Sequence, residues 1–193
     1  MKVRKVKQDG FSLAELLVMI TVLGILMAVT IPNISGILEN HRLNTFEMDA
    51  SNMVEIAKVQ VAKNSSIDKP RVGQCLIFPL DYLNTNDEFG EGPNGGIYNL
   101  YDSFVLYTRV RTSDNTTKFK YYVRLVESVK ENNYGIDLID IDEVTNLKKE
   151  DINKLPLYGL SENKDSSISL LQTELAKYST LSCTNIEYYL RKK

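Results

Sequence analysis

The hydrophobic pattern of the chain is dominated by one apolar run close to its start. Residues 11–31 read FSLAELLVMITVLGILMAVTI, and Glu15 is their single charge. As a helix with a rise of about 1.5 Å per residue, this run covers roughly 30 Å, the thickness of the hydrocarbon core of a bilayer. Residues 2–9 carry four cations and one acid, and a positive flank is typical of the cytoplasmic end of a membrane span. The pattern predicts a transmembrane helix over 11–31.

Beyond this run the sequence is more polar, but apolar residues still recur at the intervals of three and four that are typical of a helix. Turn formers begin at Asn64, so we expect one helix over 11–63, about 80 Å long. Pro32 cannot donate a backbone hydrogen bond, and with Gly24 and Gly36 nearby it predicts a kink or an easily melted stretch between these glycines. The apolar stripe that we expect to pack on the rest of the chain consists of Leu43, Phe46, Ala50, Met53, Ala57 and Val61.

Residues 64–193 form a second region in which β patterns prevail. The runs 104–111 (FVLYTRVR) and 118–126 (KFKYYVRLV) are rich in aromatic and β-branched residues and are separated by six polar ones. They predict a hairpin. In its second strand, alternation places Phe119, Tyr121, Val123 and Leu125 on one face, which can cover the long helix, and Lys118, Lys120, Tyr122 and Arg124 on the other.

Weaker patterns complete this region. We expect a strand over 136–144, a loop over 153–157, a short helix over 167–178 and a last strand over 186–190. The predicted fold class is α+β, in which a long N-terminal helix packs on an antiparallel β-sheet head. The first half of this helix is transmembrane and the second half amphipathic.

Composition narrows the possible functions. With 43% apolar and 25% charged residues the chain is globular rather than disordered, and its net charge of -2 does not favour non-specific binding to nucleic acid. One histidine, His41, and two cysteines are too few for a zinc site of His and Cys ligands or for several disulfides. No common catalytic motif is present. We therefore expect no enzyme and no cofactor.

The N-terminal run allows three interpretations. A cleaved signal peptide usually has a shorter apolar core, and only Ala28-Val29-Thr30 weakly resembles its cleavage site. A plain signal anchor explains the length and the positive flank, but it does not explain Glu15, because a charge in lipid costs at least a few kcal/mol. The third interpretation starts from Glu15 and its neighbours.

Gly10, the sequence FSLAEL over 11–16, the apolar run and Pro32 together closely resemble the prepilin signal of type IV pilins and pseudopilins. The resemblance covers about residues 1–45. It implies that prepilin peptidase, a membrane aspartyl protease, cuts between Gly10 and Phe11 and that Phe11 is then N-methylated. Glu15 becomes the fifth residue of the product, where the family keeps a glutamate, and Pro32 lies at the family's usual proline. Ser12 and Ala14 depart slightly from the common Thr and Val.

The resemblance also implies a type IV pilin-like organisation and role. Residues 1–10 are a cytoplasmic leader, 11–63 the long helix and 64–193 an extracytoplasmic head. The precursor crosses the membrane once, and the product joins a surface pilus or an envelope-spanning pseudopilus. Its partners are prepilin peptidase, other pilin subunits in a homo- or hetero-polymer, the assembly machinery and the membrane. The residues leave open a major pilin, a minor pilin and a pseudopilin.

Glu15 has two possible roles in this setting. In a filament, its charge could pair with the new amine of Phe11 on a neighbouring subunit and set the subunit register. Alternatively, it could lie near the membrane interface and merely reach water there. The second role fits a signal-anchored binding domain that never polymerises, which is the opposed hypothesis for the chain.

Three weaker candidates lie in the head. Cys75 and Cys183 could form a disulfide in an exported chain, or remain buried thiols. The glycine-rich loop over 84–99 contains Asp87, Glu88 and Glu91, weak candidates for Ca²⁺ ligands, although a solvated loop fits better and we expect no metal. Four further acids are equally weak candidates for Ca²⁺ ligands, namely Asp137, Asp140, Asp142 and Glu143.

A basic cluster near the hairpin is the last candidate. Cations interleaved with tyrosines could bind DNA, as in a minor competence pilin, but an ordinary exposed hairpin face explains them better. The cations are Arg109, Arg111, Lys118, Lys120 and Arg124, and the tyrosines are Tyr107, Tyr121 and Tyr122.

Overall fold

The computed structural model of the chain describes residues 12–84, 89–130, 132–160, 164–178, 181 and 183–190, and within these it leaves the side chains of 29–35 and 164–167 undescribed. The chain divides into two compact units, Met1–Asn40 and His41–Lys193. Helix α1 contributes to both units, whereas all strands belong to the second. Each unit is described by itself below.

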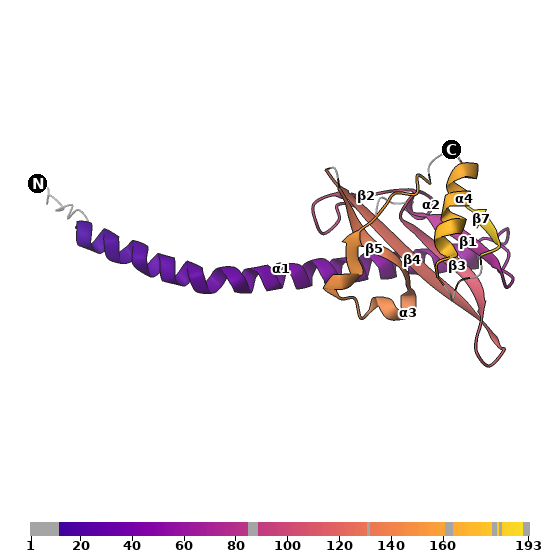
Figure 1. Cartoon of the computed structure of the whole chain (residues 1–193), viewed down its shortest axis with the longest axis horizontal. Coiled ribbons are helices and arrows are strands. Elements are labelled where there is room, and N and C mark those ends of the chain that lie inside the picture. Colours follow the sequence, from indigo (N-terminus) through magenta and orange to yellow (C-terminus); the bar gives the residue numbers. More distant parts are fainter. Residues whose placement is uncertain are drawn as a thin grey trace, which may run out of the picture. The chain divides into compact units, whose positions relative to one another are not determined.

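Helix α1 spans Leu13–Lys63, and Figure 1 shows it as the long indigo and violet coil. Its end at Lys63 confirms the predicted boundary. Asn64 closes the helix there, because its side-chain oxygen accepts a hydrogen bond from the backbone N–H of Ser66 at 3.0 Å. The backbone remains helical between Gly24 and Gly36 and through Pro32. The predicted kink or easily melted stretch does not interrupt the helix, and it stays a prediction.

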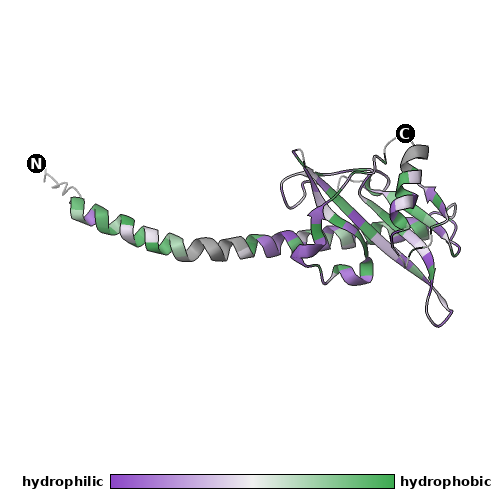
Figure 2. Cartoon of the chain, in the orientation of Figure 1, coloured by the Kyte–Doolittle hydropathy of each residue, from purple (hydrophilic) through white to green (hydrophobic). Residues whose placement is uncertain are grey.

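Apolar side chains in the first unit are exposed. Figure 2 shows the early turns of α1 as mainly hydrophobic, and the exposed fractions of Leu16, Met19 and Leu23 are 57%, 55% and 52%. Across the residues that are described, no helix has both the length and the apolar character needed to cross a membrane. Phe11, where the predicted span begins, lies outside the described residues.

The second unit is built on a sheet in the order β6-β5-β4-β3-β1-β7, with β2 paired to β4. Strands β1 and β7 are parallel, and the other pairs are antiparallel. The strands are β1 Gln74–Pro79, β2 Ile97–Tyr98, β3 Phe104–Arg111, β4 Thr117–Val129, β5 Asn132–Asp140, β6 Ile152–Lys154 and β7 Asn185–Tyr188. The shorter helices are α2 Leu80–Leu83, α3 Ile141–Val144, the 3-10 turn η1 Lys149–Asp151, and α4 Lys164–Leu175.

Two apolar layers cover the two faces of this sheet. The second half of α1 packs on one face, where Phe46, Met53 and Ala57 are fully buried. Their neighbours on the sheet include Phe78 and Val123. On the opposite face, the buried residues of α4 and the loop before it are Tyr158, Leu160, Leu171 and Leu175, packed on Ile77, Phe104, Leu106 and Tyr122. The predicted packing of the stripe on one sheet face is thus confirmed from Phe46 to Val61, whereas Leu43 is not part of this cluster (Figure 1).

The structure confirms the predicted hairpin and corrects several of the weaker elements. Strands β3 and β4 pair in register from Phe104 with Arg124 to Arg111 with Thr117. Strand β5 begins earlier than predicted and ends at Asp140, because the carboxylate of Asp140 accepts a hydrogen bond from Asp142 N and starts α3. Strand β6 occupies part of the predicted loop over 153–157, whereas α4 and β7 lie close to their predicted positions.

Candidate functional site

The start of α1 is a capping box formed by Ser12 and Glu15. Glu15 Oε2 accepts hydrogen bonds from Ser12 N at 2.8 Å and from Ser12 Oγ at 2.9 Å. Ser12 Oγ in turn accepts the N–H of Glu15 at 3.3 Å. These bonds satisfy backbone donors that the first turn of a helix leaves free. The pattern Ser-x-x-Glu ahead of an apolar run was available in the sequence, so this role of Glu15 could have been predicted.

Glu15 is also surrounded by apolar side chains along the helix. Leu13 is 84% exposed and Leu17 55% exposed, so a lone carboxylate interrupts an open apolar surface. The carboxylate already accepts two bonds within its own chain. An amine from another molecule would therefore share this carboxylate with Ser12. Gly10 and Phe11 lie outside the described residues, and of Pro32 only the backbone is described.

Cys75 and Cys183 are joined by a disulfide in the structure, with their Cα atoms 5.4 Å apart. Cys75 is buried in β1, and Cys183 precedes β7. The bond fixes the segment before β7 beside the first strand of the sheet. Its presence in protein from the native host stays a prediction.

Of the weak candidates for Ca²⁺ ligands in the glycine-rich loop, the structure describes only Glu91. Asp87 and Glu88 lie outside the described residues, and Glu91 is exposed beside Ile97. Among the described residues no group of three His, Cys, Asp or Glu side chains could hold a metal ion. Two of the other acids that were considered are engaged with cations, since Asp137 pairs with Arg124 and Asp140 with Lys120.

A carboxylate that the sequence analysis missed organises the glycine-rich loop. Glu127 of β4 is fully buried and accepts hydrogen bonds from Asn94 N at 2.9 Å, Asn94 Nδ2 at 2.8 Å and Gly96 N at 2.7 Å. Gly92 lies so close that an added Cβ would be 2.5 Å from Glu127 Cδ. One buried acid therefore holds the loop. The alternation of polar and apolar residues along β4 does not indicate this role of Glu127.

The predicted basic cluster is divided between the two faces of the sheet. Arg109 pairs with Phe119 and lies on the face of Tyr107 and Tyr121, while Lys120 and Arg124 lie on the opposite face. Arg109 stacks over the Phe119 ring at 5.3 Å, and Lys120 is bonded to Asp140. The cations therefore do not form one continuous basic surface.

Arg124 is the centre of a buried polar network. Its exposed fraction is 1%, and its guanidinium donates to Asp137 Oδ1 at 2.5 Å, Pro156 O at 2.5 Å and the Tyr158 hydroxyl at 3.2 Å. Asp102 accepts the backbone N–H of Tyr158 at 2.5 Å, and desolvation raises the pKa of this buried carboxyl. Desolvation likewise raises the pKa of Tyr158 to about 12. The network fixes the 155–160 loop on the sheet.

A second polar contact joins α1 to the sheet within the second unit. The Tyr98 hydroxyl donates to Asp49 Oδ2 at 2.6 Å. Desolvation raises the pKa of Asp49, although this hydrogen bond partly offsets the effect. Desolvation also raises the pKa of Tyr98, so the phenol stays protonated and can donate.

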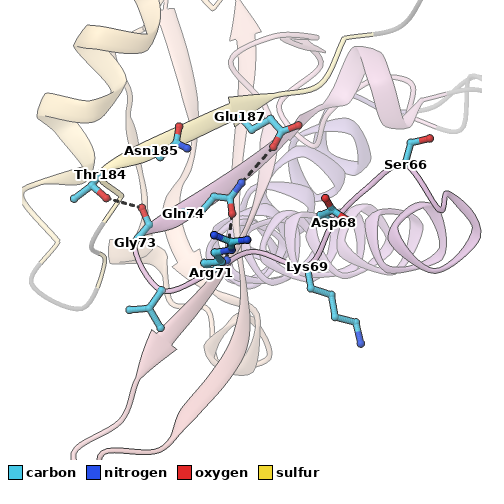
Figure 3. Close-up of a pocket in the computed structure, with 10 residues that line it drawn as sticks. Ser66, Asp68, Lys69, Arg71, Gly73, Gln74, Thr184, Asn185 and Glu187 are labelled. Carbon is cyan, nitrogen blue, oxygen red and sulfur yellow. Dashed lines mark hydrogen bonds between the residues drawn. The ribbon is translucent and has the colours of Figure 1, made fainter.

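Described residues of the head line at least two open hollows. The first, of about 660 Å³ and called here the β7 hollow, is lined by polar groups from the segment before β1 and from β7 (Figure 3). Gln74 Nε2 reaches Glu187 Oε2 at 3.4 Å across it, and Thr184 Oγ1 donates to Gly73 O at 3.0 Å. The lining residues are Ser66, Asp68, Lys69, Arg71, Val72, Gly73, Gln74, Thr184, Asn185 and Glu187.

The second hollow, of about 610 Å³, lies on the α4 side of the sheet, and we call it the tyrosine hollow. Its lining combines apolar residues with two tyrosines and four charged side chains. The residues are Val110, Arg111, Thr112, Lys120, Tyr122, Leu138, Ile139, Asp140, Glu143 and Tyr178.

Comparison with known proteins identifies the N-terminal segment. Residues 5–31 match the family model of the prokaryotic N-terminal methylation motif. No curated protein and no solved structure matches the chain significantly. The match includes Gly10, Phe11 and Glu15, and it confirms the resemblance that these residues indicated. The chain carries the prepilin-type methylation motif of type IV pilin-like precursors at its N-terminus.

Proposed function

We propose that the chain is a structural subunit of a type IV pilus or pseudopilus, with no catalytic role. The observation that carries the proposal is the methylation motif over 5–31, which contains the start of the long helix α1. Residues 1–10 are the cytoplasmic leader, 11–31 anchor the precursor in the membrane, and 64–193 form the extracytoplasmic head. Prepilin peptidase cuts between Gly10 and Phe11, Phe11 is N-methylated, and the helices of many subunits then pack together.

The exposed apolar surface of the first unit supports polymerisation through the helix. Leu16, Leu17 and Met19 are all more than half exposed in the single chain. Such a surface is stable only when lipid or other apolar helices cover it. A filament core provides this cover once the subunit leaves the membrane.

Processing is tested by intact-mass analysis of protein from its native host. The expected product is the 183-residue chain that starts at Phe11, with the added mass of one methyl group. Removal of the leader takes away four cations and one acid, so the net charge changes from -2 to -5. A product that starts near Ile31 would show cleavage by signal peptidase and would refute the proposal.

Assembly is tested by Glu15→Ala beside wild type at equal expression. In a dry filament core the carboxylate needs the Phe11 amine of a neighbour, so the variant should accumulate in the membrane and be missing from sheared filaments. Ser12→Ala is the matched control, because it removes the cap and leaves the charge. Normal incorporation of Glu15→Ala would refute the proposed role of the carboxylate between subunits. Absence of wild type itself from sheared filaments would favour the second candidate, a signal-anchored binding domain that does not polymerise.

The DNA-binding minor pilin has less support in the structure than the sequence suggested. Lys120 and Arg124 are engaged with Asp140 and Asp137, and Arg124 is buried. A protein that holds phosphates needs several accessible cations on one surface. Of the other cations of the predicted cluster, Arg109 is already stacked on Phe119, and Arg111 and Lys118 are exposed near the end of the hairpin.

A further inference from the structure

The glycine-rich loop contains the one Asn-Gly dipeptide of the sequence, Asn94-Gly95. In a mobile chain such a pair deamidates spontaneously. The backbone nitrogen of the glycine attacks Cγ of the asparagine, and the absence of a side chain on the glycine leaves the approach open. A nitrogen–Cγ bond forms, the Cγ–Nδ2 bond breaks, and ammonia leaves with the proton of the glycine nitrogen. Water then opens the succinimide ring at one of its two carbonyls and leaves an aspartate or an isoaspartate.

Both reacting groups of this pair are held in hydrogen bonds. Asn94 Nδ2, the leaving group, donates to Glu127 Oε2 at 2.8 Å, and Asn94 N donates to Glu127 Oε1 at 2.9 Å. Gly95 N, the nucleophile, donates to Gly92 O at 3.0 Å. The attack requires the Asn94 side chain to turn toward Gly95 N and this nitrogen to turn away from Gly92 O. The ring therefore cannot close until these bonds are broken.

The loop has no room for this movement while it lies on β4. Glu127 is fully buried, and its carboxylate also accepts from Gly96 N at 2.7 Å. A Cβ added at Gly92 would be 2.5 Å from Glu127 Cδ, and one added at Gly96 would be 2.3 Å from Ser128 O. The loop is thus in close contact with β4, and hydrogen bonds to a carboxylate are among the stronger ones. Asn94 can react only in molecules in which the loop has separated from β4.

The product of the reaction does not fit the place of Asn94. An aspartate would put a carboxylate oxygen where Asn94 Nδ2 now lies 2.8 Å from Glu127 Oε2, and two carboxylates that share a site repel each other. An isoaspartate adds one carbon to the backbone between Gly92 and Gly96, where Gly92 N donates to Gly96 O at 2.8 Å. Either product should keep the loop from returning to β4.

We propose that Asn94 is a latent site of spontaneous deamidation, which Glu127 blocks while the loop is folded and which keeps the loop open once it has reacted. The modification needs only water. Its rate reports how often the loop opens, and each event is irreversible. The site is independent of filament assembly through α1.

Peptide mapping of the full chain in micelles tests the block. The protein is incubated in warm, mildly alkaline buffer and digested, and mass spectrometry separates the Asn94 peptide from its deamidated products. The reference is a synthetic peptide of residues 89–98, incubated in the same way. Wild type should deamidate at least about tenfold more slowly than this peptide, because opening of the loop breaks at least one hydrogen bond to a charged group. Equal rates would overturn the proposal.

Variants assign the protection to Glu127. Glu127→Gln replaces one acceptor oxygen by an NH2 group, so at least one of the donors in the loop loses its partner. Asn94 should then react about tenfold faster than in wild type. Glu91→Gln makes the same change at an exposed acid of the same loop and should keep the wild-type rate. A wild-type rate in folded Glu127→Gln would refute the role of Glu127.

Thermal unfolding of the full chain tests the irreversible step. Asn94→Asp should melt at least about 3 °C below Asn94→Ala, because both lose the amide bond and only the former adds a like charge beside Glu127. In the background of Glu127→Gln this order should reverse, because the new amide can donate to the new carboxylate. If Glu127→Gln does not fold, the comparison in the wild-type background decides alone. An Asn94→Asp variant that melts at or above Asn94→Ala there would show that the deamidated loop closes again, and would overturn the proposal.

Discussion

At the scale of single residues, Ser12 and Glu15 determine where the long helix begins. Their capping box satisfies backbone donors with a hydroxyl and a carboxylate from the same turn. The carboxylate thus has a local task as well as the proposed task between subunits. The two tasks are separable, because Ser12 takes part only in the local one.

Ser12→Ala should loosen the first turn of α1. Loss of an N-cap hydroxyl makes opening of the first turn easier, so the amides of Glu15 and Leu16, which donate to Ser12 Oγ and Ser12 O, should exchange with solvent roughly fivefold faster. Hydrogen exchange followed by NMR measures this effect on the full chain in micelles. Ser12→Thr retains a hydroxyl and should exchange like wild type. Unchanged exchange in Ser12→Ala would show that the box does not stabilise the helix start.

Asp49 makes the stability of the head depend on pH. Because its pKa is raised in the folded protein, the folded state keeps a proton that the unfolded chain releases from about pH 4 upward. The stabilisation of the folded state by this proton is complete below the pKa that Asp49 has in the unfolded chain. It is lost as the pH rises through the pKa that Asp49 has in the folded protein. Asp49→Asn removes this dependence and still accepts a bond from Tyr98.

Thermal unfolding of the full chain at several pH values checks this expectation. Between pH 4 and pH 7 the melting temperature of wild type should fall relative to that of Asp49→Asn. Glu55→Gln, a change at an exposed glutamate of the same helix, should follow wild type. A constant difference between Asp49→Asn and wild type across this range would contradict the linkage.

At the scale of elements, the disulfide joins two segments that are 108 residues apart. Cys75 lies in β1, and Cys183 lies just before β7, the strand that pairs parallel to β1. The bond therefore limits how far β7 can separate from the sheet. Its main effect is expected on the unfolded chain, where a long closed loop reduces the entropy.

Reduction of this disulfide should destabilise the head by about 2–5 kcal/mol. Urea unfolding with and without a reductant measures the difference. The double variant Cys75→Ser, Cys183→Ser is the control, and the reductant should not change its stability. Two alkylatable thiols in unreduced native protein would show that the bond does not form in the cell.

The elements differ in how well the sequence predicts them, for physical reasons. The β3–β4 hairpin and the helix end at Lys63 follow from alternation and turn chemistry, which are local. Strand β1 was missed because QCLIFP is a short run buried on both faces, without a period that separates strand from helix. The end of β5 depends on the hydrogen bond by which Asp140 caps α3. The hydrophobic pattern of the sequence does not indicate this contact.

The candidate sites also differ in how well the sequence predicts them. The methylation motif is a contiguous pattern, so Gly10, Phe11 and Glu15 could be identified from the sequence alone. The buried roles of Arg124 and Glu127 depend on partners some 30 residues distant in the chain. Because other cations lie near Arg124 in the sequence, a basic surface was considered for this hairpin. Folding instead places these two groups inside the head.

At the scale of the whole molecule, the chain consists of two units that meet within α1. The core residues of this helix, from Phe46 to Ala57, all belong to the second unit. Among the described residues, the buried side chains of the head core all belong to the second unit. The stability of the head should therefore not depend on the first unit.

A chain that begins at His41 should fold to a soluble head with the melting temperature of the head in the full chain. Circular dichroism and amide NMR spectra measure this. A chain that begins at Lys58 loses Phe46, Met53 and Ala57 from the core and should not fold, because each large side chain removed costs about 2–5 kcal/mol. An unfolded chain from His41 would show that the head requires the first unit.

The pairing of β7 with β1 has a consequence for the time order of folding. Residues Gln74 to Ile77 find their parallel partners only after Asn185 to Tyr188 have been synthesised, about 110 residues later. Until then, the outer edge of an apolar strand remains open to other chains. At roughly 5–20 residues per second, synthesis leaves this edge open for about 6 to 22 seconds in every new molecule. A high local concentration of unfinished heads should therefore favour pairing between chains at that edge.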